Sequence, residues 1–128
     1  MWRLTTEWQK QQRKALSTFK LTHVQFVFLA CLKWLETHMD TNITQHQISA
    51  LSRIDKMVVS ETKRQLLQKG LITSSQHPLD KRAYAVNLTD PGDQLVQQAL
   101  PIVESVDIAF FRDNQARINR LNAVVDAL

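Results

Sequence analysis

Hydrophobic positions recur every three to four residues over most of this chain, which is the spacing of one face of an α-helix. The polar segment that opens the sequence has such positions and predicts a first helix from Leu4 to Thr18. Apolar residues then run almost without a break from Val24 to Leu35. A helix that is apolar on most faces is buried, so we expect this second helix at the centre of the fold.

Two pairs of residues have capping-box spacing, in which each side chain satisfies a free backbone N–H at a helix start. Thr22 and Gln25 form the first pair, just before the apolar helix. Thr44 and Gln47 form the second pair and predict the start of a further helix.

That further helix is short and is followed closely by a longer one. Ile48 and Leu51 are its expected inward pair, and it should end near Arg53. Asp55 is suited to cap the next helix, and Gly70 is a natural residue just beyond its end. The sequence therefore predicts a short helix, a tight turn and a helix of about 14 residues.

After this helix the hydrophobic period changes to two, which is typical of strands. The segments 71–75 (LITSS) and 83–89 (AYAVNLT) flank a charged turn, and Tyr84, Val86 and Leu88 share one side. We expect a two-stranded hairpin.

A final helical region follows the hairpin. Thr89 suits the N-cap, and Asp90 and Pro91 suit the first turn. Pro101 removes one internal hydrogen bond and should bend the helix. The helical pattern continues over 111–128 as a continuation or a last helix.

The composition fits one globular domain covering residues 1–128, with 44% hydrophobic and 22% charged residues. The longest apolar run is far shorter than the ~20 residues of a membrane span, and the first residues lack the features of a secretion signal. A cytoplasmic location is expected. The single cysteine, Cys31, lies in an apolar stretch without a basic neighbour, which favours a buried core thiol over a redox sensor.

The net charge is +4, and the basic excess lies in the first two thirds of the chain. Residues 1–43 carry six basic and three acidic side chains, residues 44–90 seven and four, and residues 91–128 three and five. A local basic excess suits a polyanionic partner, although many soluble proteins share it.

The predicted order of short helix, turn, longer helix and hairpin is that of a winged helix-turn-helix unit, whose second helix fits the major groove of duplex DNA. In the helix from Lys56 to Lys69, the expected inward residues are Val59, Thr62, Leu66 and the stem of Lys63. The opposite face, suited to phosphate and base-edge contacts or simply to solvent, carries Lys56, Met57, Ser60, Glu61 and Arg64.

Three segments resemble the MarR family of bacterial transcription regulators: LTHVQF at 21–26, TQHQISALSRIDKMVVSETKRQLLQKGLI at 44–72 and LDKRAYAVNLTDPG at 79–92. The similarity covers roughly residues 15–111. Its most specific part is Asp80-Lys81-Arg82, similar to the family's D-x-R motif in the hairpin, or wing.

The resemblance implies a winged helix-turn-helix protein, mostly α with a small β-hairpin wing, that binds duplex DNA as a homodimer. Arg82 would enter the minor groove, Asp80 would hold it by an ion pair, and Lys81 would add a contact; the alternative is an exposed salt bridge of little value. Thr44 and Gln45 are also expected at the DNA. His77 is interpreted as a plain turn residue.

The resemblance also divides the chain into a DNA-binding lobe at about 22–90 and dimerisation helices at about 4–18 and 91–128. The first helix is shorter than the family's. Either the interface depends more on residues 101–128, or an N-terminal portion is missing. Candidates for this interface, for which intrachain core is the alternative, are Phe110, Phe111, Ile118, Leu121, Val124, Val125 and Leu128.

Family effectors bind between the lobe and the dimer helices. A small-molecule pocket would therefore involve aromatic residues that are otherwise interpreted as core: Trp8, Phe19, His23, Phe26 and Trp34.

No catalytic set, metal motif or cofactor motif is recognisable, and an enzyme is not expected. The neighbouring carboxylates Glu104 and Asp107 are interpreted as a solvated helix face. The sequence thus predicts a homodimeric regulator that binds a pseudo-palindromic operator and responds to a small molecule. The alternative is a winged-helix protein-interaction module without sequence-specific DNA binding.

Overall fold

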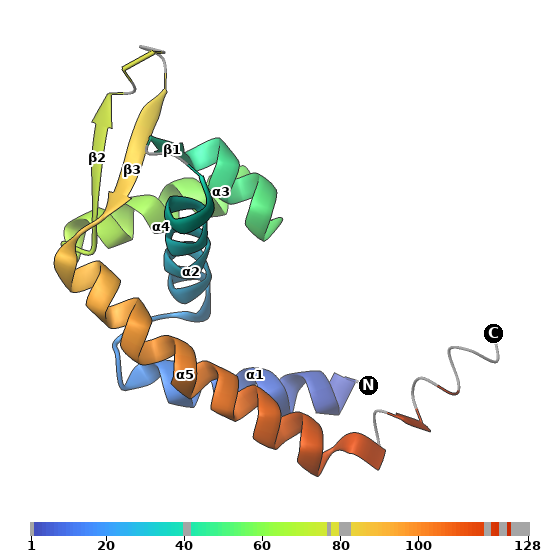
Figure 1. Ribbon diagram of the computed structural model, residues 1–128. Helices are drawn as coiled ribbons and strands as arrows, with labels where there is room; N and C mark the ends of the chain where they lie inside the picture. The colour runs from blue at the N-terminus through green and yellow to red at the C-terminus, as the bar shows by residue number, and fades with distance from the viewer. Residues whose placement is uncertain are drawn as a thin grey trace.

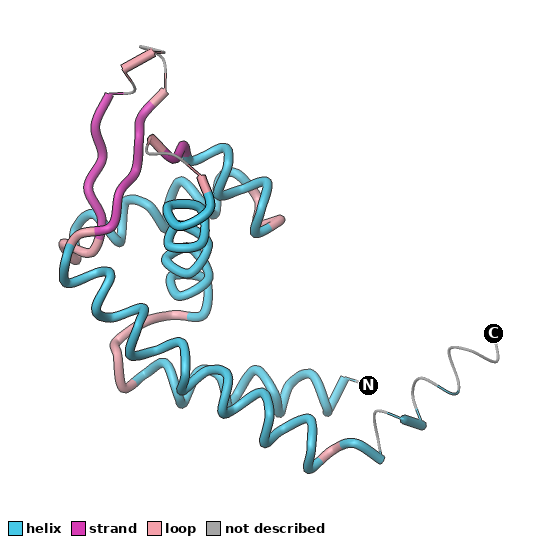
Figure 2. The backbone as a smooth tube through the Cα atoms, viewed as in Figure 1, coloured by secondary structure: helices cyan, strands magenta, loops and turns pink. Residues whose placement is uncertain are grey.

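The computed structural model describes residues 2–39, 42–76, 78–79, 83–116, 119–120 and 123. In chain order the elements are α1 (Trp2–Ser17), α2 (His23–His38), β1 (Ile43–Thr44), α3 (Gln45–Ser52), α4 (Lys56–Gln68), β2 (Ile72–Gln76), β3 (Tyr84–Leu88) and α5 (Asp90–Asp113). Figures 1 and 2 show two parts, a lobe that runs from α2 to β3 and an arm in which α1 lies beside α5.

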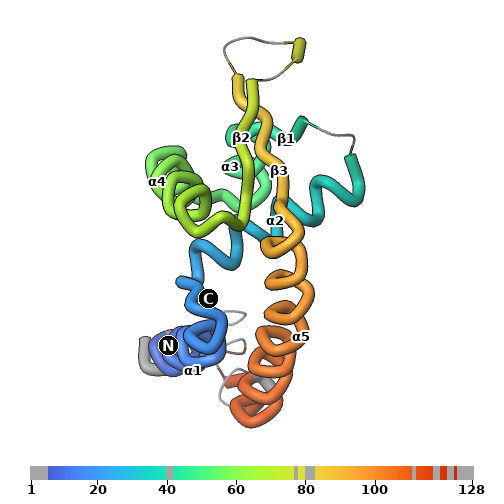
Figure 3. The backbone as a smooth tube through the Cα atoms, turned by 90° about the vertical axis from the view of Figure 1, so that its left-hand side faces the viewer, coloured from blue at the N-terminus to red at the C-terminus, as the bar shows by residue number. Residues whose placement is uncertain are grey.

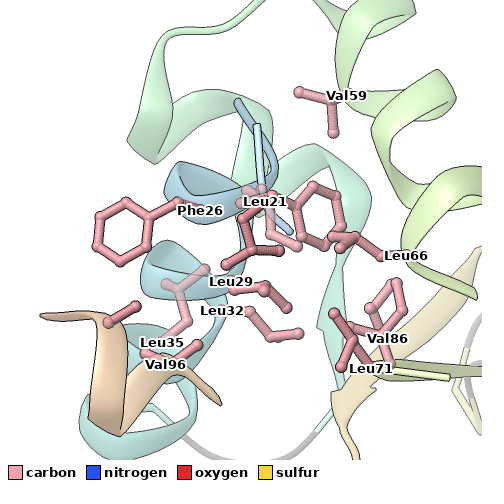
Figure 4. Close-up of a cluster of buried hydrophobic side chains, with 14 of the residues drawn as sticks. Leu21, Phe26, Leu29, Leu32, Leu35, Val59, Leu66, Leu71, Val86 and Val96 are labelled. Atoms are coloured by element: carbon pink, nitrogen blue, oxygen red, sulfur yellow. The ribbon is translucent and has the colours of Figure 1, made fainter. Parts of the chain in front are cut away.

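The centre of the lobe is α2, as the sequence predicted. Phe28, Leu29 and Leu32 on this helix are at most 1% exposed. Figure 4 shows side chains of α2 facing apolar side chains from α4, the sheet and α5. Burial of this apolar surface is the main contribution to the stability of the lobe.

The sheet has the strand order β1-β3-β2, and both pairings are antiparallel. The hairpin of β2 and β3 was predicted and is confirmed, with Ile72 opposite Leu88 and Gln76 opposite Tyr84. The sequence did not predict β1, whose Ile43 pairs with Val86. A strand of two residues is too short to show a hydrophobic period.

The structure corrects the predicted burial in α3 and adds detail to the burial along β3. Leu51 was expected to face inward with Ile48, but Leu51 is 44% exposed whereas Ile48 is fully buried. Leu51 lies in the last turn of α3, which leaves the core as Arg53 adopts left-handed backbone (φ 59°). In β3, Tyr84 is 55% exposed, and Ala85 is buried together with Val86, so burial does not alternate along the strand.

The start of α5 is fixed to the end of α4 by a compact junction. The hydroxyl of Thr89 donates to the carbonyl of Gly70 at 2.8 Å and accepts from the N–H of Gly92 at 3.1 Å. The backbone N–H of Thr89 donates to the carbonyl of Leu71 at 3.1 Å. A Cβ on Gly92 would lie only 2.0 Å from that carbonyl oxygen, so the approach of the two helices requires glycine here.

The arm leaves the lobe along α5, which continues through Pro101 to Asp113. Figure 3 shows the β2–β3 hairpin at the opposite end of the molecule from α1. Phe110 is only 3% exposed, which makes it intrachain core and removes it from the candidate dimer surface. The side chain of Phe111 and the other interface candidates (Ile118, Leu121, Val124, Val125 and Leu128) lie outside the described residues.

Within the described part of the chain, no helix is both long and apolar enough to cross a membrane.

Candidate nucleic-acid interface

The longer helix of the helix-turn-helix pair, α4, is fixed at both ends by its own backbone and caps. The carboxylate of Asp55 accepts the N–H of Met57 at 3.0 Å, as predicted for an N-cap. At the other end, Gly70 has φ +71° and its N–H donates to Leu67, while the N–H of Leu71 donates to Leu66. These two bonds form a Schellman motif, so α4 has a defined length and presents a defined face.

The outward face of α4 contains the five predicted residues. Val59, Thr62 and Leu66 are at most 4% exposed and form the inward row. On the opposite face, all exposed, lie Lys56, Met57, Ser60, Glu61 and Arg64. We call this set the outward face of α4.

Glu61 and Arg64 form an ion pair on that face. Nε of Arg64 donates to Oε2 of Glu61 at 3.0 Å, and Nη2 donates to Oε1. These hydrogen bonds lower the pKa of Glu61 and raise the pKa of Arg64. Because both side chains are more than half exposed, the pair contributes little to stability, but it fixes the orientation of the guanidinium group.

Lys63 was expected to lay its stem along the inward row, and the structure gives its ammonium a further role. It lies 5.3 Å from the centre of the Tyr84 ring, in a cation–π contact that joins α4 to β3. Partial burial lowers the pKa of Lys63. Lys63 and Tyr84 line a hollow of about 240 Å³ together with Thr44, Gln45, His46 and Ala83.

Thr44 is occupied by its cap. Its Oγ1 accepts the N–H of Gln47 at 3.2 Å, and its own N–H donates to Oε1 of Gln47 at 2.8 Å. Gln45 and His46 follow it in the first turn of α3 and lie at the same hollow. His46 was not predicted at the site, because a polar residue in a short helix has no distinguishing feature in the sequence.

The wing projects beyond the helices of the lobe (Figure 1). Leu79, in its loop, is 91% exposed. The predicted wing residues Asp80, Lys81 and Arg82, and the turn residue His77, lie outside the described residues.

A separate cavity lies at the corner between α1 and α2. It has a volume of about 170 Å³ and is lined by Trp8, Gln9, Gln12, Arg13 and His23. The rings of Trp8 and His23 meet edge to face, with centroids 6.0 Å apart.

Of the five residues expected around an effector, only Trp8 and His23 line this cavity. Phe26 is 6% exposed and belongs to the core, and Phe19 packs against that core. Trp34 is 49% exposed and stacks on His38 at 4.3 Å, about three turns along α2 from the cavity.

Gln12 is the most unusual residue of the cavity wall. It is 2% exposed, and its Nε2 donates to Oδ1 of Asp107. Nε1 of Trp8 donates to the same oxygen at 2.8 Å. Asp107 was predicted on a solvated face, which is wrong, because it holds α1 against α5.

Among the described residues, Oε1 of Gln12 finds no hydrogen-bond partner. A buried unpaired acceptor costs free energy, and this oxygen has almost no accessible surface. Gln9, Gln12 and Arg13 were not predicted at a site, because polar residues on an amphipathic helix ordinarily face solvent.

Within the described residues no group of three or more His, Cys, Asp or Glu side chains could hold a metal ion. Cys31 is half-buried, and burial raises the pKa of its thiol.

The chain is similar to proteins of a known family. Residues 17–106 match the model of the ArnR1-like winged-helix domain. The whole chain is 41% identical to the HTH-type transcriptional regulator YdcH of Bacillus subtilis (strain 168), over 86% of that protein.

Two solved structures share the fold at lower identity. A MarR mutant from E. coli complexed with operator DNA aligns with a TM-score of 0.76 at 20% identity, covering 96% of this chain and 88% of that one. Bordetella bronchiseptica BpsR, whose structure concerns regulation of its DNA binding by 6-hydroxynicotinic acid, aligns with a TM-score of 0.75 at 23% identity, covering 97% and 89%.

Proposed function

Because the chain belongs to the ArnR1-like winged-helix family and is a MarR-like transcription regulator rather than an enzyme, we propose that it binds a pseudo-palindromic operator as a homodimer in the cytoplasm. The observation that carries this proposal is the outward face of α4, whose five residues are all exposed opposite a buried row. Each protomer would place α4 in one major groove, with half-sites one helical turn apart.

The roles of the residues follow from their chemistry. Lys56 would neutralise a phosphate, and Arg64, Ser60 and Glu61 would reach base edges. The hollow of Thr44, Gln45, His46 and Lys63 is also lined by Ala83 and Tyr84 at the start of β3. It would receive the backbone beside the groove, with Gln45, His46 and Lys63 making the contacts because the hydroxyl of Thr44 is used in its cap.

The wing contacts rest on the resemblance of Asp80-Lys81-Arg82 to the family motif. Arg82, with Lys81 beside it, would lie in the minor groove, where groove width and negative potential matter more than base identity. Asp80 would support Arg82.

Binding to operator and random duplexes over a salt series tests these roles. Arg64→Ala should weaken operator binding by ~1–3 kcal/mol and random binding less. Arg82→Ala should weaken both duplexes alike and lower the salt slope by about one per wing. Asp80→Ala should weaken binding to both duplexes in the same way as Arg82→Ala, but by a smaller amount. Lys14→Ala, an exposed lysine of α1, is the matched control and should change neither duplex.

A different pattern would contradict the assignment. If Arg82→Ala bound both duplexes with wild-type affinity at every salt concentration, the wing would not contact the DNA. Equal binding of wild type to upstream DNA of its own gene and to competitor DNA would instead favour a protein-interaction module.

We also propose that the cavity at the α1–α2 corner binds a small aromatic acid that regulates DNA binding. The rings of Trp8 and His23 and the cation of Arg13 together suit a planar ligand with an acidic group. Regulation of BpsR by 6-hydroxynicotinic acid supports a ligand of this kind.

Thermal-shift measurements with aromatic acids, beginning with 6-hydroxynicotinic acid, test this cavity. An acid that stabilises the wild type should stabilise Arg13→Ala much less, whereas Lys14→Ala should respond as wild type does. An equal response of Arg13→Ala would place the ligand elsewhere.

A further inference from the structure

Met57 lies on the outward face of α4, at its N-terminal end. It lies in the first turn of the helix, opposite Thr62 and Leu66, and is 80% exposed. Its neighbours on that face, Lys56, Ser60 and Arg64, are polar or charged. A single exposed apolar residue is ordinary on most surfaces, but this one belongs to the face assigned to DNA.

The described part of the chain covers only a small part of the Met57 side chain. The hollow beside it is lined by Thr22, Val24, Val58 and Gln65, with Glu61 and Thr62. Met57 borders this hollow but keeps most of its surface in contact with solvent. Its side chain therefore adds little to the core, and its apolar surface is free for a partner that approaches α4 from outside.

We propose that Met57 recognises thymine, by packing its thioether against the C5-methyl group in the major groove. This inference rests on the proposed DNA-binding function. The thymine methyl is the apolar feature that a base pair presents in the major groove. Methionine is unbranched and polarisable, so it adapts to a methyl group without demanding one fixed rotamer.

Arg64 gives the second point of the same recognition row. Glu61 occupies Nε and one Nη2 hydrogen of its guanidinium group, which leaves further N–H donors for O6 and N7 of guanine. Met57 and Arg64 are seven residues apart, or about 10 Å along the helix. With α4 along the groove, the thymine lies about three base steps from the guanine.

The test begins with selection of binding sites from a random duplex library by the full-length wild type. Each thymine of the selected half-site is then replaced, one at a time, by deoxyuridine, which removes only the methyl group. At the position that Met57 contacts, wild-type affinity should fall about 4-fold, the effect of one buried methyl-sized group.

Variants assign that loss to Met57. Met57→Ala should bind the thymine and uracil duplexes equally, and Met57→Leu should restore most of the preference. Leu67→Ala is the matched control, because Leu67 is an exposed apolar residue of the same helix, nearly three turns away. It should keep the wild-type preference.

The outcomes separate this inference from the proposed function. Two results would overturn the role of Met57 and leave operator binding intact. In the first, the library yields a defined sequence, but no uracil replacement lowers wild-type affinity. In the second, Met57→Ala still prefers thymine to uracil. A selection that enriches no sequence overturns both, and points to a protein partner for the exposed methionine.

Discussion

Gly70 and Gly92 are the two glycines of the chain, and the structure uses them for different reasons. Gly70 needs its left-handed backbone, with φ +71°, and has open space where a Cβ would be. Gly92 needs the absence of a Cβ, because the carbonyl of Leu71 occupies that place. One residue ends α4, and the other allows α5 to start against that end.

This difference predicts two unequal destabilisations. Gly70→Ala should cost about 1 kcal/mol, the strain of a left-handed alanine. Gly92→Ala should cost about 3 kcal/mol, because backbone must move to relieve the contact. Urea unfolding of the two variants beside wild type measures both values. Equal costs would mean that the α4–α5 junction is looser than the structure has it.

Cys31 should be chemically inert. Burial raises the pKa of its thiol, so the reactive thiolate is scarce at neutral pH. Mild peroxide followed by mass spectrometry should find an unmodified thiol, and Cys31→Ser should leave DNA affinity unchanged under the same oxidant. Reversible oxidation that abolishes DNA binding in wild type alone would identify a redox sensor.

At the scale of elements, helix ends were predictable because their signals are local. Both capping boxes predicted from the spacing of Thr22 with Gln25 and of Thr44 with Gln47 are present. The exposed ring of Tyr84 in β3 meets Lys63 of α4 in a contact that was not predicted. Lys63 is 21 positions away in the sequence, so the alternation of hydrophobic residues within the strand does not reveal the contact.

The contact of α1 with α5 depends on Asp107, which accepts hydrogen bonds from Trp8 and Gln12. Asp107→Ala should leave both donors without this partner and lower the free energy of local opening of α1 by ~1–3 kcal/mol. Hydrogen exchange of the α1 amides measures this. Glu104→Ala, an exposed carboxylate one turn earlier in α5, should leave exchange unchanged. A loss of protection throughout the lobe would show that Asp107 has a wider role.

At the scale of the whole molecule, the lobe was predictable and the cavity was only partly so. The order of elements that defines a winged helix-turn-helix follows from the spacing of hydrophobic residues along the sequence. The cavity brings together α1, α2 and, through Asp107, α5, over a separation of 95 residues between Gln12 and Asp107. No periodicity encodes which polar residue of α1 is buried by such a distant partner.

The proposed dimer predicts that the exposed apolar residues of α5 meet a second copy. Ile102 and Ile108 are 45% and 66% exposed, on the sides of α5 away from its buried row. Light scattering should give about twice the 14.8 kDa chain mass, and Ile108→Glu should shift the protein towards monomer. Leu51→Glu, a matched exposed site on α3, should remain dimeric. A monomeric wild type, both free and on DNA, would contradict the dimer.

Because α5 is one continuous helix, a movement of its arm end also displaces its lobe end. Its 24 residues span about 36 Å, with one end fixed at Gly92 beside the end of α4 and the other end in the arm. In a dimer, a tilt of about 5° at the arm would carry the lobe end about 3 Å, close to the spacing of one base pair. Each α4 would thereby move out of phase with its half-site while the lobe itself kept its shape.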